Sequence, residues 1–401
     1  GGQLPRSVAP GPLVQRQPLF GGFGRRRSGP RSHFTMCDRV PEPFNSRREL
    51  RMRRPDDWHH HLRDGPDVLR DTVRAAARAF SRAIIMPNLV PPVTTVAAAG
   101  EYRERIEAAL AASGGAPGSF TPLMTLYLTD TTTVAAVEAA AASGFIKAFK
   151  LYPAGATTNS DSGVTDYAKI EPALRAMAAH GLVLCVHGEV TDPAVDVFDR
   201  ERVFVRTRLP QLISMAPGLK IVLEHLSTKE AVESVLHGGP NLAGTITPQH
   251  LLANRNALLA GGIRPHLYCL PILKTEEDRR ALLDALRTGC PRLFLGTDSA
   301  PHAIGRKETG CGCAGIFNAN AALELYAEAC TRTSCRRECP RVPESAREHP
   351  RDYLRVPEIA RDCARLRESR RSRRRVPSST SRPSARCTAP PSTACPPTTR
   401  W

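Results

Sequence analysis

Short apolar segments rich in β-branched residues recur at fairly even intervals through the middle of this chain. Most are separated by stretches in which Ala, Leu, Glu and Arg follow a helical spacing, such as DVLRDTVRAAARAF and TVAAVEAAAAS. The eight segments cover residues 49–54, 82–89, 120–128, 145–152, 182–189, 219–226, 243–250 and 292–299. Strands that alternate with helices predict a parallel sheet.

Eight strand–helix units within roughly 250 residues match the size of a TIM barrel, so we predict an α/β fold of the (β/α)8 type over residues 49–329. A doubly wound open sheet is the alternative arrangement for alternating strands and helices. The barrel is favoured because no G-x-G-x-x-G follows the first segment, where a dinucleotide-binding open sheet would carry it.

The charge of the chain is concentrated at its two ends. The formal net charge is +17 over 401 residues, but residues 1–50 hold nine Arg against three acidic residues, and residues 330–401 hold eighteen Arg against seven. The region between them is therefore close to neutral, and no nucleic-acid partner is expected for the barrel. No apolar run reaches 18 residues, so no membrane span or membrane partner is predicted.

The two ends differ in composition from the barrel region. Residues 1–48 form a leader whose first 35 residues contain Arg but neither Asp nor Glu, which is typical of a transit peptide and predicts an organelle, plastid or mitochondrion. A disordered leader on a cytoplasmic protein is the alternative. Residues 330–401 are rich in Arg, Pro and Ser. They are expected to be either a disordered basic tail or the product of a reading frame lost near residue 330.

Polar residues at the ends of the expected strands are the main indication of function. His59 and His61 follow the first segment, Lys150 lies near the end of the fourth, and His187, His225 and Asp298 end the fifth, sixth and eighth. These strand ends form the active-site face of a TIM barrel, so the six side chains should meet at one mouth. Taken singly, each has an ordinary explanation: a hydrogen-bonded His, a surface Lys, or an Asp that caps a helix. Their joint occurrence favours a metal site.

The ligand types narrow the choice of metal. Four imidazoles and a carboxylate suit zinc or a similar borderline divalent ion. Because side chains alternate along a strand, His59 and His61 should lie on the same face, and His60 should point the other way. The sequence therefore predicts a functional pair with a bystander between its members.

At these positions the sequence resembles the dihydroorotases of the shorter, class II type, which belong to the amidohydrolase superfamily. The matching segments are RRPDDWHHHLRDG, MPNLVPPVTT, KLYPAGATTNS, VHGEV, EHLSTK, TITPQHL, RPHLYCLPILK, GTDSAPH and CGCAG. The resemblance covers residues 50–329 and implies a TIM-barrel hydrolase of the metal-dependent type. The reaction it implies is the reversible cyclisation of N-carbamoyl-L-aspartate to (S)-dihydroorotate, with loss of water, in pyrimidine biosynthesis.

The resemblance also implies a cofactor arrangement. Two Zn²⁺ ions per subunit are expected, one bound by His59, His61 and Asp298 and the other by His187 and His225. Lys150 is expected to react with CO₂ to give N6-carboxylysine, because a carbamate can bridge two cations and an ammonium cannot. A hydroxide that bridges the two metals would be the nucleophile. Asp298 would accept a proton from it and return a proton to the leaving nitrogen.

Substrate contacts are implied in the same way. They are expected from Arg63, Asn88, Leu270, His302 and Ala314, with Thr157 and Thr158 on a flexible loop that closes over the substrate. Read without the family, Arg63 could instead be a surface ion pair with Asp64 or Asp56, and the Thr pair could be an ordinary turn. The family resemblance also implies a homodimer.

The sequence departs from the family pattern at two places, and two other functions compete with the dihydroorotase interpretation. His60 stands where a small or apolar residue is expected, and the Arg-rich tail replaces the usual C-terminal segment. The first competing function is another cyclic amidase, similar to hydantoinase or dihydropyrimidinase. The second is an inactive truncated product whose basic ends bind other molecules.

Overall fold

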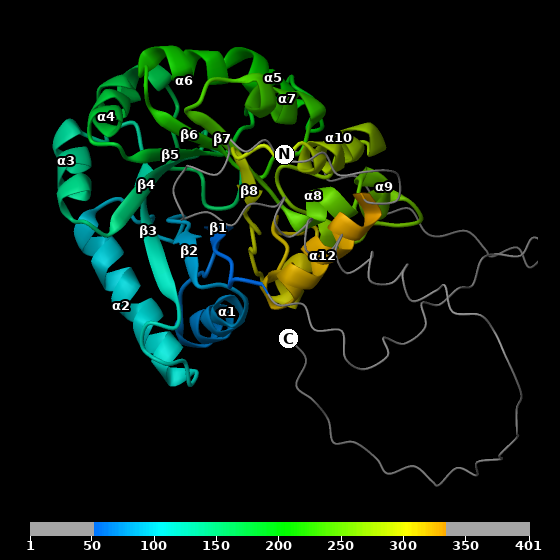
Figure 1. Ribbon diagram of the computed structural model, residues 1–401, viewed down its shortest axis with the longest axis horizontal. Helices are drawn as coiled ribbons and strands as arrows, with labels where there is room; N and C mark the ends of the chain where they lie inside the picture. Colours follow the sequence, from blue (N-terminus) through cyan, green and yellow to red (C-terminus); the bar gives the residue numbers. More distant parts are fainter. Residues whose placement is uncertain (1–51, 334–401) are drawn as a thin grey trace, which may run out of the picture. The chain divides into compact units, whose positions relative to one another are not determined.

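A parallel sheet of eight strands, surrounded by helices, forms the computed structural model over residues 52–333, the part of the chain that the structure describes (Figure 1). Each strand pairs with its neighbours in chain order, from β1 to β8. The strands are β1 (Asp57–His60), β2 (Arg82–Ile85), β3 (Thr121–Leu128), β4 (Ile146–Leu151), β5 (Val183–Val186), β6 (Lys220–Leu223), β7 (Leu242–Ile246) and β8 (Leu293–Leu295). The predicted TIM barrel is confirmed. The leader and the tail beyond residue 333 lie outside the described residues.

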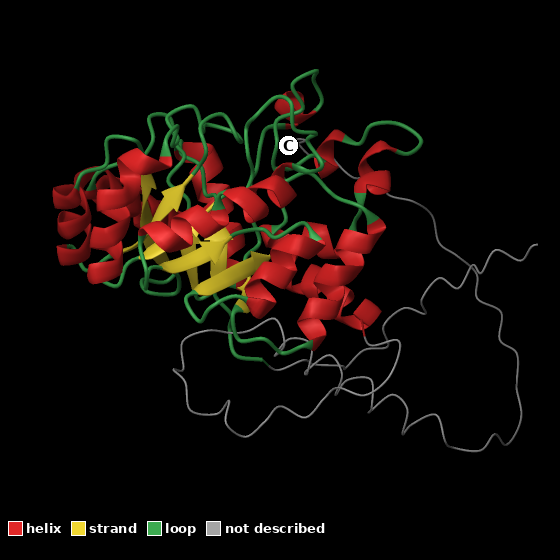
Figure 2. Cartoon of the chain, turned by 90° about the horizontal axis from the view of Figure 1, so that it is seen from above, coloured by secondary structure: helices red, strands yellow, loops and turns green. Residues whose placement is uncertain are grey.

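Helices cover the outside of the sheet, and Figure 2 shows the strands enclosed between them. The longer helices are α1 (Pro66–Ala79), α2 (Val96–Ala112), α3 (Val134–Ala142), α4 (Tyr167–Ala179), α5 (Arg200–Thr207), α6 (Leu209–Met215), α7 (Lys229–His237), α10 (Glu276–Arg287) and α12 (Ala322–Thr333). Shorter turns are α8 (Pro248–Leu252), α9 (Arg255–Leu259), α11 (Ile304–Lys307), η1 (Pro265–Leu267) and η2 (Ala319–Ala321). Within residues 52–333, no helix has the length and apolar character needed to cross a bilayer.

Helix starts are encoded locally by threonine. The hydroxyl groups of Thr95, Thr133 and Thr228 each accept a hydrogen bond from a backbone N–H in the first turn of the helix that follows. A side-chain acceptor at this position satisfies a donor that the helix itself leaves without a partner. These caps fix where the chain leaves the active-site face and turns back along the outside of the barrel.

The first strand is not where the sequence analysis placed it. We predicted residues 49–54, but β1 is Asp57–His60, and residues 52–54 are not in a strand. Arg53 and Arg54 are exposed, whereas the DWHH segment is largely buried. Burial of two guanidinium groups in a barrel wall would be costly without partners, so the strand begins after them. The other seven predicted segments each contain the observed strand or overlap it closely.

The seam between the first and last strands closes the barrel. Asp57 accepts hydrogen bonds from the backbone N–H groups of Thr297 (2.8 Å) and His59 (3.2 Å), and from the Thr297 hydroxyl. The His60 Nδ1–H donates to the same carboxylate at 2.7 Å. Asp57 is fully buried, so it holds the two strands together through interactions that water cannot replace.

Replacement of Asp57 by Ala should destabilise the fold. The change leaves two buried N–H groups, a hydroxyl and an imidazole without their acceptor, and we expect a loss of about 3 kcal/mol in the free energy of unfolding. Chemical denaturation of Asp57→Ala measures it, with Asp67→Ala as a control at an exposed helix position. Equal stability of the two variants would refute the proposal that Asp57 holds the segments at β1 and β8 together.

Candidate metal centre

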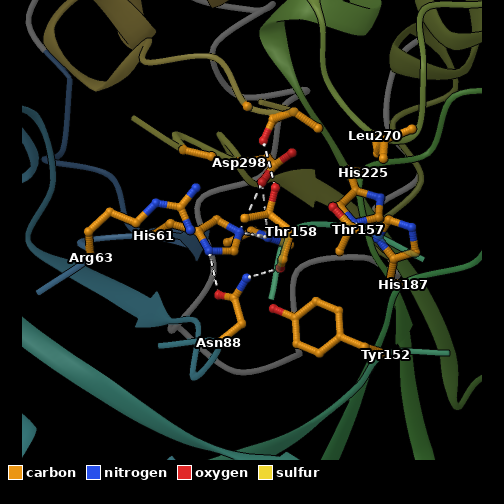
Figure 3. A pocket seen from close by; sticks show the side chains of 14 residues that line it. His61, Arg63, Asn88, Tyr152, Thr157, Thr158, His187, His225, Leu270 and Asp298 are labelled. Atoms are coloured by element: carbon orange, nitrogen blue, oxygen red, sulfur yellow. Dashed lines mark hydrogen bonds and ion pairs between the residues drawn. The ribbon is translucent and has the colours of Figure 1, made fainter. Parts of the chain in front are cut away.

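One cavity at the carboxyl ends of the strands collects most of the predicted side chains (Figure 3). Its lining consists of His59, His61, Arg63, Asn88, Tyr152, Thr157, Thr158, His187, His225, Leu270, Asp298, Ala300, Ala314 and Gly315. Lys150 and His302 are not part of this lining, but both contact residues at the site. The structure therefore brings together residues that are up to 256 positions apart in the chain.

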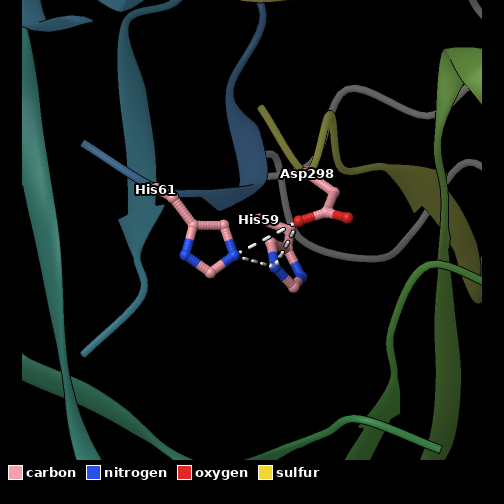
Figure 4. Close-up of side chains that lie close together, drawn as sticks. All are labelled: His59, His61 and Asp298. Carbon is pink, nitrogen blue, oxygen red and sulfur yellow. Dashed lines mark hydrogen bonds and ion pairs between the residues drawn. The ribbon is translucent and has the colours of Figure 1, made fainter. Parts of the chain in front are cut away.

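His59, His61 and Asp298 form the first cluster (Figure 4). The Nε2 atoms of the two histidines are 3.1 Å apart, and each lies 3.2 Å from Asp298 Oδ1. Both histidines come from the end of β1 and lie on one face, as the spacing predicted. Asp298 follows β8 with a φ of 47°, a left-handed conformation that turns its carboxylate towards the pair. It does not cap a helix, since α11 begins at Ile304 after Ala303.

His187 and His225 form a second pair directly after β5 and β6. Nδ1 of His187 lies 3.1 Å from Nε2 of His225, and both rings are buried. The Nε2–H of His187 donates to the Glu189 carboxylate at 2.9 Å, which leaves a lone pair on the Nδ1 that faces His225. The His225 backbone has a φ of 43°, again in the left-handed region.

Lys150 lies between the two clusters on β4 and is completely buried. Its ammonium contacts the carboxylate of Glu224, which is also completely buried. The second oxygen of Glu224 is 3.1 Å from His59 Nδ1. Glu224 precedes His225 and joins it and His59 in a second group that could hold a metal ion.

The side chains present fit a bound cation. Among the described residues, no hydrogen-bond partner is found for the buried Nδ1 of His225, and the buried His59 Nδ1 has only Glu224 Oε1 beside it, at 3.1 Å. Two pairs of imidazole nitrogens approach to 3.1 Å, where at most one of each pair can donate. Lone pairs and carboxylates that converge in a buried space are what a borderline divalent ion coordinates.

Charge and burial act in opposite directions within this centre. Burial lowers the pKa of His59, but Glu224 and Asp298 outweigh burial and raise that pKa to about 9. Burial dominates at His61 and lowers its pKa to about 3. For Glu224, burial raises the pKa, and His59 and Lys150 reverse the effect and bring it to about 2. The carboxylates are thus held in the ionised form that a cation requires.

His60 lies away from the centre, as the strand alternation predicted. Its ring is fully buried and its Nδ1 is bonded to Asp57. It belongs to neither of the two groups that could hold a metal ion within residues 52–333. The departure from the expected small or apolar residue therefore strengthens the seam of the barrel and does not add a competing ligand.

Arg63 lines the same cavity, and Figure 3 shows its guanidinium beside His61. Its Nε–H donates to the Pro301 carbonyl at 3.1 Å, and Nη2 lies 3.1 Å from His302 Nε2. The proposed ion pairs with Asp64 and Asp56 are absent, because Arg105 binds Asp64 and Arg82 binds Asp56. No carboxylate within residues 52–333 forms an ion pair with Arg63, which leaves a half-buried cation facing the cavity.

Asn88 joins the metal side of the cavity to the loop of Thr157 and Thr158. Its Oδ1 accepts from His61 Nδ1–H at 2.8 Å, so the Nε2 lone pair of His61 faces the cluster. Its Nδ2–H donates to the Thr158 carbonyl at 3.0 Å. The Thr158 hydroxyl in turn donates to the Ala314 carbonyl at 3.3 Å. The loop thus lies across the cavity and is more than an isolated turn.

Sequence reasoning missed three polar side chains of the site, Tyr152, Glu189 and Glu224, and the lining residues Ala300 and Gly315. A signal for each polar side chain was present. Tyr152 and Glu189 stand two positions after Lys150 and His187, so alternation places them on the same face. Glu224 is a carboxylate next to His225 in an otherwise apolar run, and such a residue is rarely buried without a partner.

The chain is similar to known enzymes over most of its described length. The family described as "Amidohydrolase family" matches residues 57–349. The dihydroorotase of Shewanella amazonensis is 60% identical over 280 residues, which cover 70% of this chain and 80% of that protein. Among solved structures, the dihydroorotase of Campylobacter jejuni is 38% identical with a TM-score of 0.62, covering 70% of this chain and 78% of that chain.

Two further solved structures have a similar fold. The dihydroorotase of Saccharomyces cerevisiae, solved in complex with 5-fluoroorotic acid, is 32% identical with a TM-score of 0.62, covering 69% of this chain and 78% of that chain. The L-hydantoinase of Arthrobacter aurescens is 18% identical with a TM-score of 0.55, covering 68% and 65%. The likeness to the hydantoinase concerns the fold alone.

Loss of one ligand should lower the metal content. We expect His61→Ala to bind less zinc per chain than the unchanged protein, because a three-residue cluster becomes a two-residue one. Elemental analysis after dialysis against a weak chelator measures the content. His237→Ala, at an exposed helix end, is the matched control. Identical metal content in the two variants would rule out His61 as a ligand.

Proposed function

This chain belongs to the dihydroorotases of the amidohydrolase family, and from that premise we propose how its residues carry out the reversible cyclisation of N-carbamoyl-L-aspartate to (S)-dihydroorotate. The observation that carries the proposal is the combination of two kinds of group in one cavity. Histidines and a carboxylate that suit a divalent cation share its lining with Arg63, a cation without a carboxylate partner among the described residues.

The metal-binding side chains would hold two zinc ions. His59, His61 and Asp298 would bind one ion, and His187 and His225 the other. Bound zinc supplies Lewis-acid chemistry, which makes water a nucleophile near neutral pH and polarises a carbonyl. Asp298 accepts a proton on a carboxylate oxygen in the hydrolytic direction and returns it to the ring nitrogen that leaves. The Asn88 and Glu189 hydrogen bonds fix which nitrogen of His61 and His187 is available.

Lys150 is proposed to carry a carbamate. The neutral amine adds to the carbon of CO₂, a C–N bond forms, and one proton is released. The product is an anion with two oxygen ligands, in the buried position where an ammonium now contacts Glu224. Conversion of a cation to an anion there suits a centre with two divalent ions, because the local charges then balance.

Arg63 is proposed to bind the substrate carboxylate. A guanidinium can donate two parallel hydrogen bonds to a carboxylate, and His302 beside it can orient the group. Leu270 and Ala314 would offer backbone groups, Asn88 its amide, and Thr157 and Thr158 a loop that excludes water. An uncharged ring, as in hydantoin or dihydrouracil, would leave Arg63 without a counter-charge, so the dihydroorotase assignment is preferred over another cyclic amidase.

Hydrolysis of dihydroorotate by the purified full chain, with its zinc content measured on the same sample, tests the function. We expect turnover with about two zinc ions per chain, no turnover on hydantoin or dihydrouracil, and no activity in Lys150→Ala. A folded and zinc-loaded protein that hydrolyses only uncharged rings would contradict the assignment.

Replacement of Arg63 by Met should act on the substrate and not on the metal. The variant keeps most of the apolar stem and loses the charge, so we expect kcat/KM for dihydroorotate to fall by about 100-fold or more. Zinc content should be unchanged. Arg175→Met, an exposed helix position, is the control. A fall in activity that is fully explained by lost zinc would point to a different role for Arg63.

The carbamate can be observed directly. Protein that is stripped of metal and reloaded in ¹³C-labelled bicarbonate should give a carbamate carbon resonance, and Lys150→Ala should give none. A labelled signal of equal strength in the variant would place the carbamate elsewhere or refute it.

Assembly and location are part of the proposal. The family resemblance supports a homodimer, and light scattering of the full chain measures its mass in solution. The Arg-rich, acid-free leader supports import into an organelle. Fluorescence from a fusion of residues 1–48 would be expected in a plastid or mitochondrion, and a diffuse cytoplasmic signal would argue against import.

A further inference from the structure

Lys307 is a buried lysine that the proposed chemistry does not use. It is the last residue of α11, its side chain is 3% exposed, and no carboxylate within residues 52–333 forms an ion pair with it. Its Nζ donates to the carbonyl oxygens of Tyr268 (2.9 Å), Cys313 (2.6 Å) and Gly315 (2.8 Å). An ammonium has three N–H bonds, so every donor of Lys307 has a backbone acceptor.

The three carbonyls belong to two segments that form one wall of the active-site cavity. Leu270 lies two residues after Tyr268, and Ala314 lies between Cys313 and Gly315. Both Leu270 and Ala314 line the cavity. The backbone N–H of Gly315 donates to the Tyr268 carbonyl at 3.0 Å, so a single direct bond joins the segments besides those made by Lys307. The ammonium therefore supplies most of the hydrogen bonds between the two parts of this wall, and apolar packing of Ile316 near Leu270 adds to them.

The segment around Ala314 has a backbone conformation that needs outside support. Cys313 has a φ of 30° and Gly315 a φ of 151°, both outside the regions that most residues prefer. A Cβ atom on Gly315 would lie 2.4 Å from the Ala300 carbonyl oxygen, so the turn packs closely against the chain after β8. The charge-assisted hydrogen bonds of Lys307 to the carbonyls on either side of Ala314 offset this cost.

The wall also meets the loop that crosses the cavity. The Ala314 carbonyl accepts from the Thr158 hydroxyl at 3.3 Å and lies 2.9 Å from Nε2 of His302. A shift of Ala314 would therefore change the position of Thr158 and of the partner of Arg63 together. Other contacts, at the β1–β8 seam and along β5 and β6, hold the side chains that could bind a metal ion. His61 is linked to Thr158 through Asn88, but these side chains should move less than Thr158 and His302.

We propose that Lys307 is a positioning residue for the substrate: its ammonium fixes the backbone of Leu270 and Ala314 against the Thr158 loop and thereby sets the affinity for the cyclic carboxylate. The inference rests on the proposed function. Lys307 does not touch the reacting atoms, so its removal acts on substrate binding more than on turnover.

Lys307→Met in the full chain tests the proposal, because Met keeps the length and apolar stem and removes all three donors. We expect KM for dihydroorotate to rise about tenfold or more, kcat to change by less than about threefold, and zinc content to stay the same. The dissociation constant of 5-fluoroorotic acid, the ligand of the yeast dihydroorotase structure, should rise in parallel with KM. Lys147→Met is the control, since this exposed lysine donates to the Gly144 carbonyl at the start of β4.

The outcomes separate this inference from the proposed function. Absence of dihydroorotate turnover in the unchanged, zinc-loaded chain refutes the function itself. An active chain whose Lys307→Met variant keeps its KM and loses only thermal stability overturns the role of Lys307. If Lys307→Met does not fold, KM, kcat and zinc content are measured for Lys307→Gln, with the same expected results. Failure of both variants to fold, with Lys147→Met intact, assigns Lys307 to folding and also overturns the proposal.

Discussion

Closure of the barrel between β1 and β8 is the constraint on which the metal centre depends. The backbone N–H of Asp298 donates to the His59 carbonyl at 2.9 Å, and that of His61 donates to the Ser299 carbonyl at 3.0 Å. The Asp57 carboxylate adds side-chain bonds to Thr297 across the same seam. Because the ends of the first and last strands carry three of the candidate metal ligands, residues about 240 positions apart come together only when the sheet closes.

The candidate metal centre brings polar and charged groups together in a buried space, where they lose contact with water and groups of like charge repel one another. Four imidazoles, two carboxylates and the Lys150 ammonium are buried within a few residues of the strand ends. A bound divalent ion satisfies the lone pairs and the negative charge together, whereas without it one nitrogen of each pair at 3.1 Å must donate to the other. The rigid parallel sheet keeps these groups in place, and left-handed backbone at His225 and Asp298 aims the last two.

Two cations on the substrate side have different surroundings and hence different tasks. All three N–H bonds of Lys307 end on carbonyl oxygens, so its charge stabilises the backbone of the cavity wall. The guanidinium of Arg63 has five N–H bonds, and its hydrogen-bond contacts within residues 52–333 are with the Pro301 carbonyl and His302. A guanidinium with donors to spare at a cavity wall is suited to an incoming carboxylate, and a lysine with none is suited to hold that wall in place.

The sequence by itself determined the eight-strand pattern, the barrel class and the strand-end positions of His59, His61, Lys150, His187, His225 and Asp298, because alternation and strand–helix spacing are local properties. It misplaced the first strand, because the exposure of Arg53 and Arg54 depends on neighbours that are distant in the chain. Only the tertiary structure showed that Glu224 contacts Lys150 and that His60 donates a hydrogen bond to Asp57. It also showed that Lys307 donates to the carbonyls of Tyr268 and Gly315. The contacts of Glu224 with Lys150 and of Lys307 with Tyr268 join segments 74 and 39 positions apart, and packing of the folded chain brings each pair together.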